Sequence, residues 1–121
     1  MSLSLVIADD DATIREALGD LLEAKGFEVL ARARDGAEAV EAAVEFRPDL
    51  VIVDIRMPGV NGIEAMQQIT DRMPGMRLMA LSAYDDPALA AAARAAGALD
   101  YVTKGTPPAE LCSRILALAE V

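Results

Sequence analysis

The stretch that decides the fold is LVIVDIRMPG, residues 50–59. A run of apolar, mostly β-branched residues leads into Asp54, and a Met-Pro-Gly turn sequence follows shortly after it. A run of this length and composition predicts a strand that is buried on both faces, as in a parallel sheet. In open α/β sheets, ligands bind and reactions take place where such strands end. Asp54 is therefore the first candidate for a functional residue.

Strand patterns and amphipathic helix patterns alternate five times along the chain. This alternation predicts an α/β fold, a (βα)₅ doubly wound parallel sheet with strand order 2-1-3-4-5 and helices on both faces. The expected strands are residues 3–8, 27–33, 50–53, 76–81 and 99–102. A helix is expected after each strand, and the first should turn Ile14, Leu18, Leu21 and Leu22 inward.

The chain is short and acidic. Its 121 residues predict one domain over 1–121, and its net charge of −9 would repel nucleic acid and anionic membranes. No histidine is present, which excludes histidine metal ligands, histidine general bases and a phosphohistidine carrier. The single Cys112 excludes an internal disulfide. Without a signal-peptide or membrane-span pattern, we expect a soluble, cytoplasmic domain.

The first predicted strand, residues 3–8, also ends in acid, at Asp9, Asp10 and Asp11. Strands one and three are neighbours in a doubly wound sheet, so Asp9, Asp10 and Asp54 should meet at one edge. At ~4 Å and an effective dielectric constant of ~20, each pair of like charges costs about 4 kcal/mol. Folds tolerate such a cost mainly where a cation binds, and an all-oxygen site suits Mg²⁺ or Mn²⁺.

Two further polar residues should reach the same edge, Ser82 after the fourth strand and Lys104 after the fifth. A hydroxyl, an ammonium, a divalent ion and a nucleophilic carboxylate are the groups that phosphoryl transfer requires. Taken singly, each residue has a simpler interpretation: Asp11 as the N-cap of the first helix, Ser82 as a residue at the start of a helix, and Lys104 as a solvated lysine. Their joint position at strand ends favours the phosphoryl-transfer interpretation.

Four segments, DD (9–10), VIVDIRMPGVNG (51–62), ALSAY (80–84) and DYVTK (100–104), follow one another in an order that resembles the receiver domain of two-component response regulators. The NarL/FixJ (LuxR-type) branch is the most similar. The resemblance covers essentially the whole chain and implies a flavodoxin-like fold. It implies that Asp54 is the phospho-acceptor and that Ser82 and Lys104 contact phosphoryl oxygens. For Mg²⁺ it implies four ligands: Asp10 directly, Asp9 largely through water, Asp54, and the backbone carbonyl of Arg56.

The resemblance also implies a switch, in which phosphorylation draws Ser82 inward and Tyr101 rotates into the vacated space. The alternative for Tyr101 is an ordinary strand aromatic with a solvated hydroxyl. We expect Arg56 and Tyr84 to flank the path of water to the acyl phosphate and to slow its hydrolysis. One departure from most receivers is Gly105, which follows Lys104 where proline is usual and gives a freer loop.

By the same resemblance, the phosphodonor is a partner histidine kinase, and a homodimer can form on phosphorylation. The chain would be no enzyme beyond its own Mg²⁺-dependent phosphoryl transfer and slow autodephosphorylation. Regulators of the NarL/FixJ type usually continue into a helix-turn-helix DNA-binding domain. We therefore expect the output to be transcription regulation through a domain outside these residues; a complete single-domain protein is the alternative.

Two other functions are compatible with parts of the sequence. VIADDDAT, residues 6–13, fits the DxDxT pattern of haloacid-dehalogenase-type phosphatases, with Asp9 as nucleophile and Asp11 as general acid. Against it, no acidic metal-binding pair follows Lys104, no cap insertion is present, and Asp54 would have no role. The second is a degenerate receiver that serves only as an interaction module, which the complete set of expected site residues disfavours.

Overall fold

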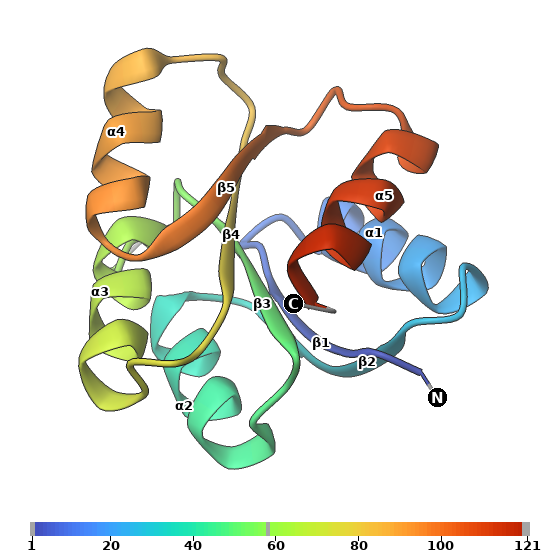
Figure 1. Ribbon diagram of the computed structural model, residues 1–121, viewed down its shortest axis with the longest axis horizontal. Helices are drawn as coiled ribbons and strands as arrows, with labels where there is room; N and C mark the ends of the chain where they lie inside the picture. Colours follow the sequence, from blue (N-terminus) through green and yellow to red (C-terminus); the bar gives the residue numbers. More distant parts are fainter. Residues whose placement is uncertain (1, 58, 120–121) are drawn as a thin grey trace.

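The computed structural model describes residues 2–57 and 59–119 as five strands and five helices in strict alternation (Figure 1). All strand pairings are parallel and the strand order is β2-β1-β3-β4-β5, which confirms the predicted topology. The elements are β1 (Ser4–Ala8), α1 (Ala12–Ala24), β2 (Glu28–Ala33), α2 (Gly36–Phe46), β3 (Leu50–Asp54), α3 (Gly62–Arg72), β4 (Leu78–Ser82), α4 (Pro87–Ala95), β5 (Ala98–Thr103) and α5 (Pro108–Ala119).

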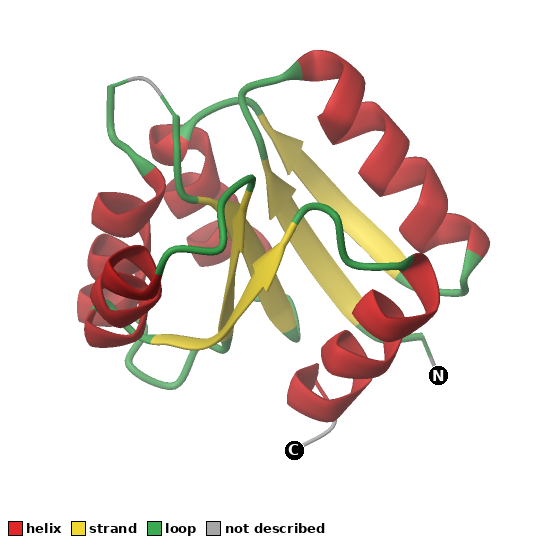
Figure 2. Cartoon of the chain, turned by 90° about the horizontal axis from the view of Figure 1, so that it is seen from above, coloured by secondary structure: helices red, strands yellow, loops and turns green. Residues whose placement is uncertain are grey.

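The sheet is sandwiched between two helical layers, α1 and α5 on one face and α2, α3 and α4 on the other (Figures 1 and 2). Successive residues of β3 serve the two faces in turn: Leu50 and Ile52 pack in the cluster that includes α1 and α5, whereas Val51 and Val53 pack in the cluster that includes α2, α3 and α4. Because both faces are covered, β3 is buried along its whole length, as its apolar run predicts.

Side chains just after the strands cap four of the helices. Asp11, Asp35, Asn61 and Asp86 each accept hydrogen bonds from N–H groups in the first turn of α1, α2, α3 and α4. A cap of this kind contributes about 1 kcal/mol to helix stability. The predicted N-cap role of Asp11 is confirmed. The caps also fix the loops at the carboxyl ends of the strands, where the candidate site lies.

One prediction about the core is wrong. Ile14 was expected to face inward, but its side chain is 38% exposed, whereas Leu22 in the same helix is fully buried. Ile14 lies in the first turn of α1 and lines a groove together with Lys104 and Pro108 instead of the sheet. Helical periodicity identifies the correct stripe, but the first turn of α1 extends past the edge of the sheet.

None of the helices in the described ranges combines the length and apolar character that a membrane crossing needs.

Candidate functional site

Three polar side chains are buried where strands end. Asp9, Asp54 and Ser82 are 1%, 3% and 1% exposed, and they lie at the carboxyl ends of β1, β3 and β4. Burying a charged group without a partner is costly, so each of these carboxylates needs compensation from its neighbours. The sequence prediction that acids gather at this edge is confirmed.

The acidic cluster consists of Asp9, Asp10 and Asp54, which each offer a carboxylate oxygen within 4.8 Å of the others. Asp10 is exposed, so the cluster opens to solvent on its side. Asp9 Oδ1 accepts a 3.0 Å hydrogen bond from the Asp11 N–H, and Asp54 Oδ1 accepts a 3.3 Å hydrogen bond from the Arg56 N–H. The turns that follow β1 and β3 therefore hold the two buried carboxylates in place.

Lys104 supplies the positive charge in this cluster. Its Nζ lies 3.2 Å from Asp54 Oδ2 and 2.9 Å from Asp9 Oδ2. Its backbone N–H donates a 2.7 Å hydrogen bond to the carbonyl of Ser82, so the end of β5 is tied to the end of β4. With a side chain only 21% exposed and paired with two carboxylates, Lys104 is not the solvated lysine of the simpler interpretation.

One ammonium does not neutralise the cluster. Burial, followed by the negative charge of Asp9, raises the pKa of the Asp54 carboxyl to about 6, against the opposing effects of Lys104 and the Arg56 N–H. Burial lowers the pKa of Lys104, but its contacts with Asp9 and Asp54 outweigh that effect and raise the pKa overall. Both directions indicate that further positive charge would be favourable here.

A divalent cation fits these residues. Asp9 Oδ2 is fully buried, and its one close cationic neighbour among the described residues is Lys104 Nζ, 2.9 Å away. A buried carboxylate oxygen that shares a single ammonium with a second carboxylate, beside a third one, is an environment that suits a hard cation with oxygen ligands. The Arg56 carbonyl as a further ligand stays a prediction.

Ser82 and Tyr101 both contact the backbone of Tyr84 in the loop between β4 and α4. The Tyr84 N–H donates a 3.1 Å hydrogen bond to Ser82 Oγ, and the Tyr101 hydroxyl donates a hydrogen bond to the Tyr84 carbonyl. The Tyr101 ring is buried in the core, so its hydroxyl is not solvated as the alternative interpretation held. Since α4 is capped by Asp86, Ser82 does not start a helix either.

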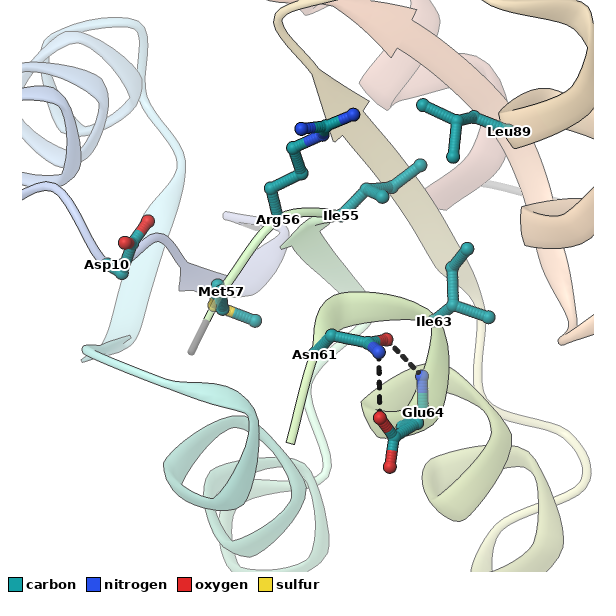
Figure 3. A pocket seen from close by; sticks show the side chains of 8 residues that line it. All are labelled: Asp10, Ile55, Arg56, Met57, Asn61, Ile63, Glu64 and Leu89. Carbon is teal, nitrogen blue, oxygen red and sulfur yellow. Dashed lines mark hydrogen bonds between the residues drawn. The ribbon is translucent and has the colours of Figure 1, made fainter. Parts of the chain in front are cut away.

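Arg56 and Tyr84 form a pair at the mouth of the site. The Arg56 guanidinium lies over the Tyr84 ring, 4.8 Å from its centroid, and both side chains are exposed. Next to this pair a groove of about 600 Å³ runs from Asp10 past Arg56 to Leu89 on α4 (Figure 3). The acidic cluster is therefore reached from solvent along Asp10 and Arg56.

The comparison with known families decides what this arrangement is. A family described as the response regulator receiver domain matches residues 5–116. The chain belongs to this family. Receiver domains are the phospho-accepting signalling modules of two-component systems, so the resemblance drawn from the sequence segments is confirmed.

Individual relatives agree with this assignment. The chain is 41% identical over 103 residues to the transcriptional regulatory protein LnrK of Bacillus subtilis, covering 84% of the chain but only 47% of LnrK. It is 37% identical over 111 residues to the chemotaxis protein CheY of Thermotoga maritima, covering 92% of each. A LuxR-family response regulator from Aurantimonas superimposes with a TM-score of 0.93 at 35% identity, covering 99% of this chain and 86% of that one.

Two residues that support the receiver's site escaped the sequence prediction. A Cβ on Gly62 would lie 2.0 Å from the Asp54 carbonyl oxygen, so only glycine allows α3 to start this close to the end of β3. Arg15 on α1 donates a 3.0 Å hydrogen bond from Nη1 to the Asp9 carbonyl. The Asn61-Gly62 pair could have been recognised as a turn, but no sequence pattern pointed to Arg15.

Proposed function

We propose that Asp54 accepts a phosphoryl group from a partner histidine kinase and that this event switches the receiver between two output states. The observation that carries the proposal is the setting of Asp54: a buried carboxylate that pairs with Lys104 and lies within 4.8 Å of two further carboxylates. With a pKa of about 6, Asp54 is mostly ionised near pH 7 and is available as a nucleophile.

In the proposed transfer, an Asp54 carboxylate oxygen forms a bond to the phosphorus of a phosphohistidine while the P–N bond breaks. The electron pair returns to the imidazole ring, which takes up a proton from solvent. Lys104, whose Nζ lies 3.2 Å from Asp54 Oδ2, and the buried Ser82 hydroxyl would interact with phosphoryl oxygens in this proposal. Bound Mg²⁺, or Mn²⁺, held by Asp9, Asp10, Asp54 and the Arg56 carbonyl, would supply the remaining positive charge.

The switch is proposed to act through the backbone of Tyr84. Its N–H is bound by Ser82 and its carbonyl by Tyr101, so one peptide segment depends on both residues. If the Ser82 hydroxyl turns to a phosphoryl oxygen, it releases or reorients the Tyr84 N–H, and the loop before α4 changes conformation with Tyr101. The change would reach the surface formed by α4 and β5.

The kinase is proposed to dock along the groove between α1 and α5. This groove, of about 340 Å³, is lined mainly by apolar side chains, and both Lys104 and the exposed Ile14 are among its lining residues. A helix packed there would lie beside the Lys104–Asp54 pair, which is where a phosphohistidine must arrive. A contiguous apolar groove next to the reacting group, rather than one exposed side chain, is what supports a protein-binding surface here.

The output is proposed to be transcription regulation through a helix-turn-helix domain outside these residues, with a homodimer forming on phosphorylation. With a net charge of −9, this domain would make no direct contact with nucleic acid. We propose that it is cytoplasmic and is no enzyme apart from its own phosphoryl transfer and slow autodephosphorylation.

The test is to incubate the chain with Mg²⁺ and acetyl phosphate and to locate the acyl phosphate by peptide mapping. We expect the label on Asp54 and its loss in Asp54→Asn. Asp11→Asn is the matched control, since asparagine keeps the N-cap and the variant should label normally. A label on Asp9 that persists in Asp54→Asn would instead indicate the phosphatase mechanism. If neither acetyl phosphate nor beryllofluoride with Mg²⁺ alters the chain, it is a degenerate receiver.

A further inference from the structure

Arg15 places a cation next to the acidic cluster without pairing with it. Its side chain is 12% exposed and turns back from α1 toward the turn after β1. Nη1 donates its hydrogen bond to the backbone carbonyl of Asp9. Within 4 Å, the one carboxylate oxygen near its guanidinium among the described residues is that of Glu16, at 3.9 Å from Nε. It is Lys104, and not Arg15, that pairs with carboxylates of the cluster.

Asp9 is held at three points. Its N–H donates a 3.1 Å hydrogen bond to the Ala33 carbonyl on β2, its Oδ1 accepts from the Asp11 N–H, and its carbonyl accepts from Arg15. The carbonyl of Asp9 and the N–H of Asp10 belong to the same planar peptide unit. The hydrogen bond from Arg15 therefore restrains the orientation of the peptide unit that leads into Asp10.

Asp10 has few other restraints. It is exposed, and among residues 2–57 and 59–119 its carboxylate makes no hydrogen bond and no ion pair. Its oxygen nevertheless lies within 4.8 Å of those of Asp9 and Asp54. The chain therefore acts on this carboxylate through the two peptide units that flank Asp10, one bound by Arg15 at the Asp9 carbonyl and the other bound to Asp9 Oδ1 through the Asp11 N–H.

We propose that Arg15 is a positioning residue of the cation site, which holds the Asp9–Asp10 peptide unit so that the Asp10 carboxylate meets those of Asp9 and Asp54. The inference rests on the proposed metal site. It makes a prediction opposite in sign to that of simple electrostatics. Removing a nearby positive charge should strengthen cation binding, whereas losing a positioning hydrogen bond should weaken it, and such outer groups typically contribute about 10- to 100-fold in metal affinity.

The experiment measures Mn²⁺ binding to the whole chain from the electron paramagnetic resonance signal of free Mn²⁺. Arg15→Met removes the charge and the donor, and Arg15→Lys keeps the charge and a donor. Arg34→Met is the matched control, because Arg34 is an exposed arginine whose guanidinium pairs with Glu38 and not with the cluster. We expect Arg15→Met to bind about 10-fold more weakly, Arg34→Met to bind no more weakly than the unmodified chain, and Arg15→Lys to recover part of the loss.

A second measurement separates positioning from loss of folding. Urea unfolding establishes that each variant is folded, and the ¹⁵N resonance of the Asp10 amide should shift in Arg15→Met, since it reports on the peptide unit that Arg15 binds. Mn²⁺ binding by Arg15→Met that equals or exceeds that of the unmodified chain would overturn the proposal, as would an Arg15→Lys variant that recovers nothing. If the unmodified chain binds no Mn²⁺, the proposed metal site itself is wrong, and the role of Arg15 with it.

Discussion

The backbone N–H of Lys104 donates a 2.7 Å hydrogen bond to the carbonyl of Ser82. This bond ties the residue that carries the ammonium to the strand that carries the hydroxyl. It also bears on the departure at the next position, where Gly105 stands in place of the usual proline. Lys104 is restrained by this backbone hydrogen bond and by the ion pairs of its Nζ with two carboxylates. The turn around Lys104 is closed by the Thr106 N–H, which donates to the Thr103 carbonyl.

Gly105 is therefore expected to tolerate a side chain. Its φ is not in the left-handed region and a Cβ there would meet nothing within 4 Å. Gly105→Ala should stabilise the protein by about 0.4–1 kcal/mol, because alanine restricts the unfolded chain. The rate of labelling by acetyl phosphate should stay within about two-fold, an allowance of about 0.4 kcal/mol at most. Urea unfolding and timed labelling provide both values.

Gly62→Ala is the opposite case and serves as the comparison. Here the new Cβ would lie 2.0 Å from the Asp54 carbonyl oxygen, so backbone has to move. We expect a loss of about 1–3 kcal/mol in the free energy of unfolding, the usual cost of forcing an extra methyl into a packed site. A Gly62→Ala variant as stable as the unmodified chain would contradict this prediction, and a destabilised Gly105→Ala variant would contradict the previous one.

The charge of Asp54 should limit the stability of the metal-free protein at neutral and alkaline pH. Its pKa is raised from 3.8 to about 6 on folding, so between these values the folded state holds more protons than the unfolded state. For a raised carboxyl pKa, stability is highest below the unfolded value and is lost as pH rises through the folded one. Two pKa units correspond to roughly 3 kcal/mol, which solvent around the exposed Asp10 reduces to about 1–2 kcal/mol.

Asp54→Asn should therefore be more stable than the unmodified chain by about 1–2 kcal/mol at pH 8 in EDTA, and the difference should vanish near pH 4. Urea unfolding across this range measures it. Asp85→Asn, which removes one exposed carboxylate outside the cluster, is the matched control. Added Mg²⁺ should close or reverse the gap, because a ligand that binds only the folded state stabilises it. An Asp54→Asn variant that is no more stable than the unmodified chain at pH 8 would show that the charge of Asp54 does not destabilise the folded protein.

How much of this could be predicted from the sequence depends on the kind of interaction. The buried strands were predictable because a parallel strand covered on both faces has to be an uninterrupted apolar run, as in residues 50–53. Once the strand order is known, the meeting of Asp9, Asp10 and Asp54 follows from topology alone. The roles of these residues come instead from the family resemblance.

Other features were beyond the reach of sequence patterns because they depend on where a side chain ends in space. Ile14 belongs to the apolar stripe of α1, but periodicity does not say where the sheet ends beneath that stripe. Arg15 makes its hydrogen bond by folding back on the turn before its own helix, which no spacing indicates. The pairing of Lys104 with Asp9 as well as Asp54 is likewise invisible in the sequence.

The Tyr101 hydroxyl should contribute measurably to the loop before α4. It donates a hydrogen bond to the Tyr84 carbonyl, so Tyr101→Phe should cost about 0.5–1.5 kcal/mol and should speed amide exchange in residues 83–86. Tyr84→Phe removes the hydroxyl of an exposed ring, and it should change neither quantity. Indistinguishable exchange in the two variants would mean that Tyr101 does not restrain this loop.

Arg56 and Tyr84 should control the lifetime of the phosphorylated form as a unit. Their side chains stack at the mouth of the site, where water would approach the acyl phosphate, so removing either one should leave the other without its partner and open the same path. We expect Arg56→Ala and Tyr84→Ala each to speed loss of the phosphoryl group. An exposed cation–π pair is worth about 0.5–1 kcal/mol. The double variant should therefore lose its phosphoryl group about two- to five-fold more slowly than the product of the two single rate increases predicts.

The measurement is a double-mutant cycle: the dephosphorylation rates of the unmodified chain, the two single variants and the double variant are compared after excess donor is removed. Strictly multiplicative effects would mean that the two side chains act separately, and unchanged rates in all variants would mean that neither one shields the acyl phosphate.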